Sequence, residues 1–407
     1  MKFSKYLLAF SLLSIIFLGG AVNSNSAVHS ESALPSLIST FENGKLYLSR
    51  KGEGYFYIPV LKGSWREMGR QYGHLLKEQM NDFYQTASGY LRMTDDQRKT
   101  VSEQFFNDLN KDMKEYIIGM AEASGFSLEK QKITCFLTPL IYLESRKLAG
   151  CSSMSVWGEY TGGRSLVIGR NWDYGKPFPS FKEFIVVVVY NPTGSPNSVA
   201  DVSFVGDLPC SWSPTSLNSS GLYIAAHGGL FSDPTVKQNN ALPFYINLLK
   251  SIFNSTSINE LEKGLLDPAN RPYSGCILNV ADAIECRVYE EATYGAKMRS
   301  GNGLMASTNH FIAPGWTGLP EVPFGLKGSY SQERLANLYK LGERYKGRLD
   351  PKLMMDIFDE TMNSGGVTIP YTIFQVVTVP HEKIMYIKSP MFSKWDKIDL
   401  KPYFNLN

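Results

Sequence analysis

The spacing of the apolar residues changes near residue 150, and this change limits the possible folds more than any other feature. Between Ser64 and residue 149, apolar residues recur mostly every three or four positions, which is the spacing of amphipathic helices. Gly125 is a typical helix stop, and Ser127 is a typical cap of the next helix. The spacing therefore predicts helices over 64–80, 94–123 and 127–149.

After residue 150 the apolar residues recur at every second position, which is typical of strands. Turn signals such as Thr161-Gly162-Gly163 separate the segments, and strand-like pieces at 45–48 and 55–58 precede the helices. Strands, then helices, then further strands predict an α/β (α+β) protein with layered, largely antiparallel sheets. The predicted strands cover 152–157, 164–170, 184–190, 199–205, 221–226, 276–281, 284–290, 303–307, 371–379 and 382–388, and the helices among them cover 241–253, 258–265, 331–345 and 350–362.

The N-terminal residues have the order of a secretory signal peptide. Lys2 and Lys5 precede an apolar run from Tyr6 to Val22, and small and polar residues follow it. We therefore predict a signal peptide over 1–26, with an uncleaved anchor as the alternative. No later segment has about 18 unbroken apolar residues, so we expect no stable membrane anchor after cleavage. The expected location is secreted or periplasmic, or lysosomal or otherwise lumenal if the protein is eukaryotic.

Charge and composition narrow the classes of partner. The chain has 41 basic and 38 acidic residues without a basic block, so we expect no nucleic-acid partner. Its 5 histidines lack the spacing of metal ligands, and no glycine-rich phosphate loop is present. The sequence therefore predicts neither a metal nor a cofactor. The abundant aromatic residues fit a large core or an apolar substrate pocket.

An odd number of cysteines in an exported protein indicates an unpaired thiol. The 5 cysteines are Cys135, Cys151, Cys210, Cys276 and Cys286. Cys151 is the natural candidate for the free thiol. Cys276 and Cys286 flank a predicted hairpin and are candidates for a disulfide, although the required geometry is narrow.

Cleavage between Gly150 and Cys151 would create a nucleophile with its own base. A cysteine thiol has a pKa of about 8.5, whereas an α-amine has a pKa of about 7.7–8.0 and accepts a proton readily near neutral pH. An N-terminal cysteine carries both groups and needs no separate histidine. Gly150 has no Cβ to block attack on its carbonyl by the thiol. The alternative is a buried structural cysteine at the start of a strand.

Three further residues support a site at Cys151. A hairpin would return Arg170 and Asp173 to the start of its first strand, where the carboxylate would hold the amine and the arginine would lower the thiol pKa. An ordinary surface ion pair is the alternative. Asn309 follows an apolar strand, and its amide is a suitable oxyanion donor, although asparagine is also a common turn residue. His310 raises a papain-like Cys/His alternative, but no such signature surrounds Cys151.

These motifs together resemble the self-processing N-terminal-nucleophile hydrolases. Within that group they are most similar to the acyl-coenzyme A:isopenicillin-N acyltransferase-like cysteine family, with choloylglycine hydrolases and acid-ceramidase/N-acylethanolamine amidases as more distant relatives. The likeness extends to the segment before Cys151, so it covers nearly all of the mature chain. It rests on Gly150-Cys151-Ser152-Ser153, Gly169-Arg170-Asn171-Trp172-Asp173-Tyr174, Asn218-Ser219-Ser220-Gly221-Leu222, Ser307-Thr308-Asn309-His310-Phe311, 62–73 and 119–125.

The resemblance implies a four-layer αββα fold and autocatalytic cleavage between Gly150 and Cys151. Cys151 would be the nucleophile and, through its amine, the base. Asp173 would hold the amine beside Arg170, Asn309 would form the oxyanion hole, and Arg334 would lie near the nucleophile. The other oxyanion contributor would come from 225–228, where this chain has His227 in place of the asparagine of the bile-salt branch.

The expected function is an exported, autoproteolytic cysteine amidase that cleaves a linear amide through a thioester on Cys151. Acyl transfer by the same intermediate, a bile-salt or penicillin-processing activity, an N-acyl-lipid amidase and a catalytically silent secreted binding protein stay open. The expected domains are a signal peptide over 1–26, a helical pro-segment over 27–150 and a hydrolase domain over 151–407. The expected ligand is a small acyl amide. The pro-segment is expected to stay bound as a subunit, and a homo-oligomer stays open.

Overall fold

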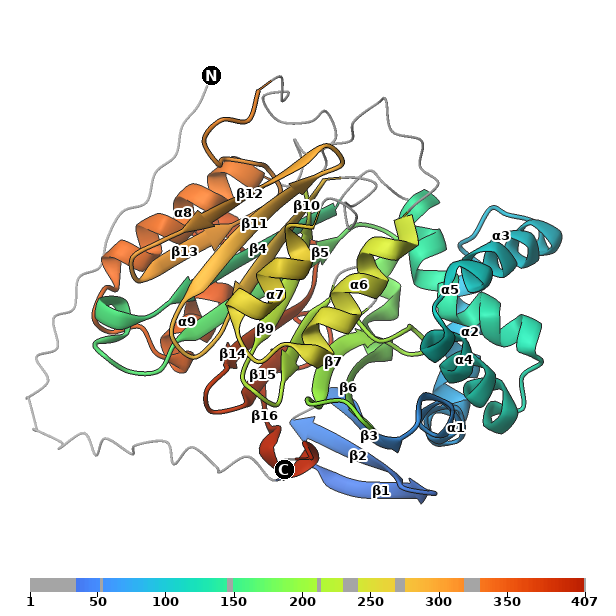
Figure 1. Ribbon diagram of the computed structural model, residues 1–407. Helices are drawn as coiled ribbons and strands as arrows, with labels where there is room; N and C mark the ends of the chain where they lie inside the picture. The colour runs from blue at the N-terminus through green and yellow to red at the C-terminus, as the bar shows by residue number, and fades with distance from the viewer. Residues whose placement is uncertain are drawn as a thin grey trace, which may run out of the picture. The chain divides into compact units, whose positions relative to one another are not determined.

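The computed structural model describes residues 34–51, 54–144, 149–210, 214–229, 241–267, 275–317 and 330–405 (Figure 1). The predicted signal peptide over 1–26 lies outside these residues. Within them, no helix combines the length and the apolar character that a membrane span requires. Leu34–Asn407 forms one compact unit.

Two β-sheets dominate this unit. In the described residues the larger sheet has 10 strands and the smaller has 6. In spatial order, the larger sheet consists of β1 (Ser36–Phe41), β2 (Gly44–Lys51), β3 (Gly54–Gly63), β6 (Ile185–Pro192), β7 (Val199–Phe204), β8 (Thr215–Asn218), β9 (Tyr223–Gly228), β10 (Cys276–Ala281), β11 (Cys286–Ala292) and β12 (Gly295–Ser300). The smaller sheet consists of β13 (Leu304–Ser307), β4 (Ala149–Val156), β5 (Val167–Tyr174), β14 (Thr372–Val379), β15 (Ile384–Lys388) and β16 (Asp396–Asp399).

Helices cover the outer faces of both sheets. On the six-stranded sheet, α8 (Ser331–Arg344) packs on β4 and β13, and α9 (Pro351–Asp359) packs on β5 and β14. On the ten-stranded sheet, α6 (Ala241–Asn254) and α7 (Ile258–Leu265) lie across the central strands (Figure 1). The order is therefore helices, sheet, sheet, helices, and the predicted αββα architecture is confirmed. Short 3-10 helices occur at Gly158–Thr161, Phe178–Phe184, Met362–Ser364 and Lys401–Tyr403.

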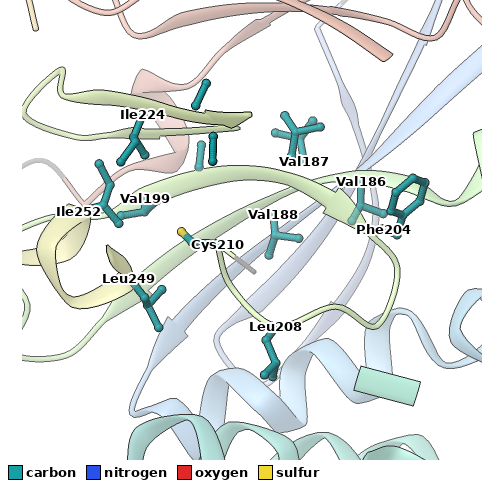
Figure 2. Close-up of a cluster of buried hydrophobic side chains, with 14 of the residues drawn as sticks. Val186, Val187, Val188, Val199, Phe204, Leu208, Cys210, Ile224, Leu249 and Ile252 are labelled. Atoms are coloured by element: carbon teal, nitrogen blue, oxygen red, sulfur yellow. The ribbon is translucent and has the colours of Figure 1, made fainter. Parts of the chain in front are cut away.

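The core follows from the alternation of side chains along the strands. Val187 and Val188 are consecutive on β6 and point to opposite sides of the strand (Figure 2). Leu249 and Ile252 of α6 lie in the same cluster, and all four side chains are almost fully buried (Figure 2). A strand buried on both faces needs the unbroken apolar run that β6 has.

The segment before Gly150 contains five helices in its described part: α1 (Trp65–Leu75), α2 (Lys77–Ser88), α3 (Asp95–Asp108), α4 (Lys111–Ser124) and α5 (Leu128–Glu144). The predicted single helix over 94–123 is wrong, because Asn110 caps a new helix by accepting the Met113 N–H. Gly125 adopts a left-handed conformation after α4, as its role as a helix stop predicts. The predicted helix over 127–149 extends too far, because Ala149 already belongs to β4.

Glycines allow α1 and α4 to pack at very short range. A Cβ on Gly69 would lie 2.1 Å from the Tyr116 carbonyl oxygen, and one on Gly119 would lie 2.1 Å from the Arg66 carbonyl oxygen. The two helix backbones therefore touch directly, which explains why both glycines are needed in these motifs.

The segment before Gly150 is built into the larger sheet. Strand β3 pairs with β6 in parallel, and the other strand pairs among the described residues are antiparallel. The Gly206 N–H donates to the Tyr72 hydroxyl of α1 at 2.8 Å. The boundary that we place between 150 and 151 falls inside strand β4. Cutting that bond would leave β3 paired with β6.

The sequence analysis missed four strands, β1, β8, β12 and β16. Strands β8 and β16 are too short to show a period, and β1 and β12 have no buried residues that would mark one face. The suggested disulfide between Cys276 and Cys286 is also wrong. Cys276 lies opposite Glu291 and Cys286 opposite Ala281, so the two thiols stand at opposite ends of the same strand pair. Neither cysteine is in a disulfide.

Candidate active site

The Gly150–Cys151 peptide lies at the start of β4, between β5 and β13. Gly150 is opposite Asp173, and Cys151 is opposite Trp172. Strand β13 pairs with the other edge of β4 and leads directly to Asn309. The hairpin and the strand order thus place Cys151, Asp173 and Asn309 together, although 158 residues separate Cys151 from Asn309.

Strand alternation puts the two reactive groups on different faces of the six-stranded sheet. Cys151 and Arg170 belong to rows that face the ten-stranded sheet, because Ser153, which is opposite Arg170, contacts His227 of β9. Asp173 belongs to the neighbouring row and faces α8, where it contacts Arg334. The Asp173 carboxylate therefore lies on the face of the sheet that α8 covers, and the Cys151 thiol lies on the face towards the ten-stranded sheet.

Asn309 is fixed by four hydrogen bonds. Its Oδ1 accepts the Cys151 N–H at 2.8 Å and an Arg334 N–H at 2.8 Å. Its Nδ2 donates to the Gly228 carbonyl at 2.9 Å, and its backbone N–H donates to Ser331 Oγ at 2.9 Å. Two donors on Oδ1 and an acceptor on Nδ2 leave one consistent orientation of the side-chain amide.

Arg334 connects the three other groups. From α8, Nη1 donates to the Cys151 carbonyl at 2.7 Å and to Asp173 Oδ2 at 2.9 Å, and Nη2 donates to Asn309 Oδ1. The guanidinium is fully buried, and its burial lowers the pKa of Arg334 while Asp173 opposes this shift. The Arg334 side chain thus bonds both to the main chain of Cys151 and to the side chains of Asp173 and Asn309.

Asp173 is a buried carboxyl with two strong partners. Besides the Arg334 ion pair, its Oδ1 accepts the Thr372 hydroxyl of β14 at 2.6 Å. Burial raises the pKa of Asp173, and the charge of Arg334 and the Thr372 hydrogen bond lower it in part. Arg334, more than Arg170, is therefore the cation that stabilises the charged form of Asp173.

Arg170 bridges the two sheets. Its guanidinium donates to the Pro214 carbonyl at 2.5 Å, to the Thr215 hydroxyl, and to the Ala226 carbonyl at 2.7 Å. It is fully buried, which excludes the surface ion pair that the sequence left open. Its charge still acts on the thiol, because it is the largest influence that lowers the pKa of Cys151.

The Cys151 thiol is buried in the intact chain. This burial raises the pKa of Cys151 above its ordinary value, Arg170 and a backbone hydrogen bond from Asp173 lower it, and the Asp173 charge raises it. The environment alone therefore does not produce a thiolate. A nearby base would be needed to remove the thiol proton.

The sequence analysis missed three supporting residues: Thr372, Ser331 and the structural role of His227. His227 Nε2 lies 2.9 Å from Ser153 Oγ, and its Nδ1 lies 3.2 Å from the Thr308 carbonyl. Burial lowers the pKa of His227 well below its ordinary value, so the ring is neutral. The tertiary structure brings these residues next to the site, and a single sequence carries no signal for such contacts between distant segments.

His310 does not support the papain-like alternative. In the described part of the chain, its Nδ1 lies 2.7 Å from Ser331 Oγ and 3.3 Å from Thr308 Oγ1. Among the same described residues, no group of three His, Cys, Asp or Glu side chains is placed to hold a metal ion.

Comparison with known proteins gives distant structural matches. No protein-family model and no curated protein matches the chain. An N-acylethanolamine-hydrolyzing acid amidase ortholog from Caenorhabditis elegans is 16% identical, with a TM-score of 0.41 over 56% of this chain and 93% of its own. Penicillin V acylase from Agrobacterium tumefaciens is 13% identical, with a TM-score of 0.40 over 61% of this chain and 86% of its own. A variant of conjugated bile acid hydrolase from Clostridium perfringens is 14% identical, with a TM-score of 0.40 over 62% of this chain and 93% of its own. Because these TM-scores are below 0.5, we base the functional inference on the geometry around Cys151.

Proposed function

We propose that the chain is a self-processing amidase in which cleavage of the Gly150–Cys151 bond makes Cys151 an N-terminal nucleophile. The observation that carries this proposal is the set of contacts made by Arg334. Its guanidinium donates to the Cys151 carbonyl, to Asp173 and to Asn309, while Asn309 accepts the Cys151 N–H. A buried cation, anion and amide around one glycyl–cysteinyl peptide are costly to bury without a function.

The first reaction would be an acyl shift within the chain. The Cys151 sulfur attacks the Gly150 carbonyl carbon, the carbon–nitrogen bond breaks, and the nitrogen leaves with the thiol proton as an amine. Water then hydrolyses the thioester, which gives a Gly150 carboxylate and frees the thiol. The hydrogen bonds from Arg334 and to Asn309 hold the carbonyl and the nitrogen of Cys151, so the attacking residue is fixed at both of its backbone groups.

The second reaction would use the same thiol on an external amide. The new α-amine of Cys151 accepts the thiol proton, the sulfur attacks the substrate carbonyl, and the departing amine takes the proton. Arg334 donates to the Cys151 carbonyl and to Asp173, which supports a role for this ion pair in holding the new amine. Asn309 Nδ2 uses one N–H on Gly228 and has a second for the oxyanion.

Water or a second amine would release the acyl group, so hydrolysis and acyl transfer share one intermediate. The proposal includes export directed by the predicted signal peptide and a pro-segment that stays bound after cleavage. The pairing of β3 with β6 supports its retention. Fold alone does not identify the acyl group. A panel of bile-acid, penicillin and N-acyl-lipid amides separates the substrate alternatives.

The decisive experiment is an intact-mass and N-terminal analysis of the mature protein. We expect two chains of about 14 and about 29 kDa from the residue count, the larger beginning at Cys151. Cys151→Ala should stay uncut and keep its fold, and Cys151→Ser should cut in part. An intact wild-type chain would exclude the self-processing mechanism. A correctly cut chain that a thiol-reactive acyl probe fails to label would be a non-catalytic protein of this fold.

A further inference from the structure

Glu290 of β11 is a fully buried carboxylate that organises the chain after Asn309. One oxygen accepts the Arg299 Nε–H at 2.8 Å and the Ile312 N–H at 2.9 Å. The other accepts the Ala313 N–H at 3.0 Å and the Trp316 indole N–H at 2.7 Å. Three of these four donors belong to 312–316, so the carboxylate fixes that short segment from beneath.

The fixed segment presents a pair of stacked aromatic rings. The Phe311 and Trp316 rings are 5.0 Å apart with an interplanar angle of 27°. Tyr294 meets the Trp316 ring edge-on at 5.9 Å, and Tyr294 is 55% exposed. With its N–H bonded to Glu290, the indole of Trp316 turns its polar edge inward. Trp316 is half-buried, and Lys297 Nζ lies 5.3 Å from the centroid of its ring. We call Phe311, Trp316 and Tyr294 the aromatic wall.

The aromatic wall adjoins the site at Cys151. A Cβ on Gly229 would lie 2.7 Å from Phe311 Cε1, so the Phe311 ring packs against this glycine. The preceding residue, Gly228, accepts the hydrogen bond from Asn309. Phe311 therefore lies one residue from the group that orients Asn309, which itself accepts the Cys151 N–H.

We propose that the aromatic wall binds the apolar acyl chain of the substrate, and that Glu290 is the positioning residue that holds the wall beside Cys151. This inference rests on the proposed function. Asn309 would hold the oxygen of the attacked carbonyl, and the acyl chain is bonded to that same carbon. A wall next to Asn309 is thus placed for the acyl side of the amide. Stacked aromatic rings favour apolar chains and rings over a methyl group.

The test compares acyl anilides that differ only in the acyl group: acetyl, hexanoyl and phenylacetyl p-nitroanilides. We expect Trp316→Ala to raise KM for the hexanoyl and phenylacetyl substrates about tenfold, because about 1.4 kcal/mol of apolar contact is lost. The acetyl substrate should change less than about twofold, and kcat and self-cleavage should be retained. Glu290→Gln keeps the shape of the side chain but removes its charge, and should lower the preference for long acyl groups about threefold.

Two further variants keep the test decisive. Trp316→Phe retains a ring without the N–H and should keep most of the acyl preference. Glu262→Gln is the matched control, because Glu262 also accepts hydrogen bonds from an arginine and an aromatic residue, Arg287 and Tyr289. It should leave the acyl preference unchanged. Equal losses for all three substrates in Trp316→Ala and Glu290→Gln would overturn the inference.

Failure of the inference is distinguishable from failure of the proposed function. A wild-type chain that neither cuts itself nor releases p-nitroaniline refutes the proposed function. In that case the wall is tested without turnover, through the fluorescence of Trp316, measured as the difference between wild type and Trp316→Phe. Quenching or a spectral shift on addition of phenylacetamide, but not acetamide, supports the wall. An unchanged difference spectrum with both amides overturns it.

Discussion

Buried carboxyls belonging to the two different sheets are stabilised in different ways. Asp173, on the outer face of the six-stranded sheet, has the buried guanidinium of Arg334 of α8 at 2.9 Å. Asp201 and Asp207, on the side of the pro-segment helices, accept hydrogen bonds from Ser216 Oγ and Cys210 N–H and from Phe204 N–H respectively. Burial raises the pKa of Asp201 to about 7 and that of Asp207 to about 8.

The difference shows that a neighbouring cation decides whether a buried carboxyl can carry a charge. A carboxylate buried against hydroxyl and amide groups keeps its proton near neutral pH, so it contributes as a neutral hydrogen-bonding group. A carboxylate paired with an arginine can remain charged and hold a neighbouring amine. The same residue type is thus suited to catalysis in one place and to a pH-dependent contact in the other.

The largest expected effect comes from removing the cation. Arg334→Met leaves Asp173 buried without its partner, so we expect a loss of about 3–5 kcal/mol in the free energy of unfolding and no self-cleavage. Urea denaturation and intact mass measure the two effects. Arg66→Met is the control, because Arg66 forms exposed ion pairs with Glu115 and Glu122, and it should leave the unfolding midpoint close to wild type. Similar losses in both variants would contradict the special role of Arg334.

The second prediction concerns pH and Asp207. Because the folded-state pKa of about 8 is above the unfolded value of about 4, the folded chain binds the extra proton between these values. The contribution of the protonated Asp207 carboxyl to the free energy of unfolding is complete below pH 4 and is lost as the pH rises towards 8. Asp207→Asn has no proton to lose and should be more stable than wild type at pH 8 by about 2–4 kcal/mol, with little advantage at pH 4.

Denaturation of wild type and Asp207→Asn from pH 4 to 9 checks this sign. Asp82→Asn, which changes an exposed carboxylate of α2, should reproduce the wild-type pH dependence. If Asp207→Asn destabilises the protein more at pH 8 than at pH 4, then the carboxyl is charged in the folded state and the contrast with Asp173 does not hold.

A smaller effect should come from the hydroxyl on Asp173. Thr372→Val keeps the shape of the side chain but removes the 2.6 Å hydrogen bond, so we expect a loss of about 1–3 kcal/mol and self-cleavage about tenfold slower. Thr378→Val on the same strand is the control. Within the described residues its buried hydroxyl has no hydrogen-bond partner, so this change should be neutral or stabilising. Equal losses would assign the Thr372 effect to packing.

The smallest expected effect tests how closely the cleaved peptide is held. A Cβ on Gly150 would lie 3.2 Å from Arg334 Nη2 and 3.3 Å from Asp173 Cβ, a tight contact that small shifts can relieve. Gly150→Ala should therefore cost less than about 1 kcal/mol and slow self-cleavage a few-fold. Gly295→Ala, with open space around its Cβ, is the control and should cut at the wild-type rate. Unchanged cutting by Gly150→Ala would show that Arg334 does not hold this peptide.

The sequence predicted the layered architecture and most element types because periodicity is a local property. The unbroken apolar run of β6 and the helix start and stop at Ser127 and Gly125 are readable from neighbouring residues alone. It did not predict the break at Asn110, since an asparagine within an apolar period caps a helix only when its side chain accepts the Met113 N–H. Short edge strands such as β16 were not predicted, because their extended conformation depends on pairing with a neighbouring strand.

The sequence by itself determined that a glycyl–cysteinyl bond lies where helices give way to strands, and which polar residues follow at the ends of later strands. Only the tertiary structure decided how those residues are used. Asp173 and the Cys151 thiol lie on opposite faces of one sheet. Arg334 forms the ion pair with Asp173, and Arg170 bonds to Ala226 of the other sheet. The physical reason is that side-chain alternation and strand pairing act between segments far apart in the chain, so no local pattern can specify which cation meets which carboxylate.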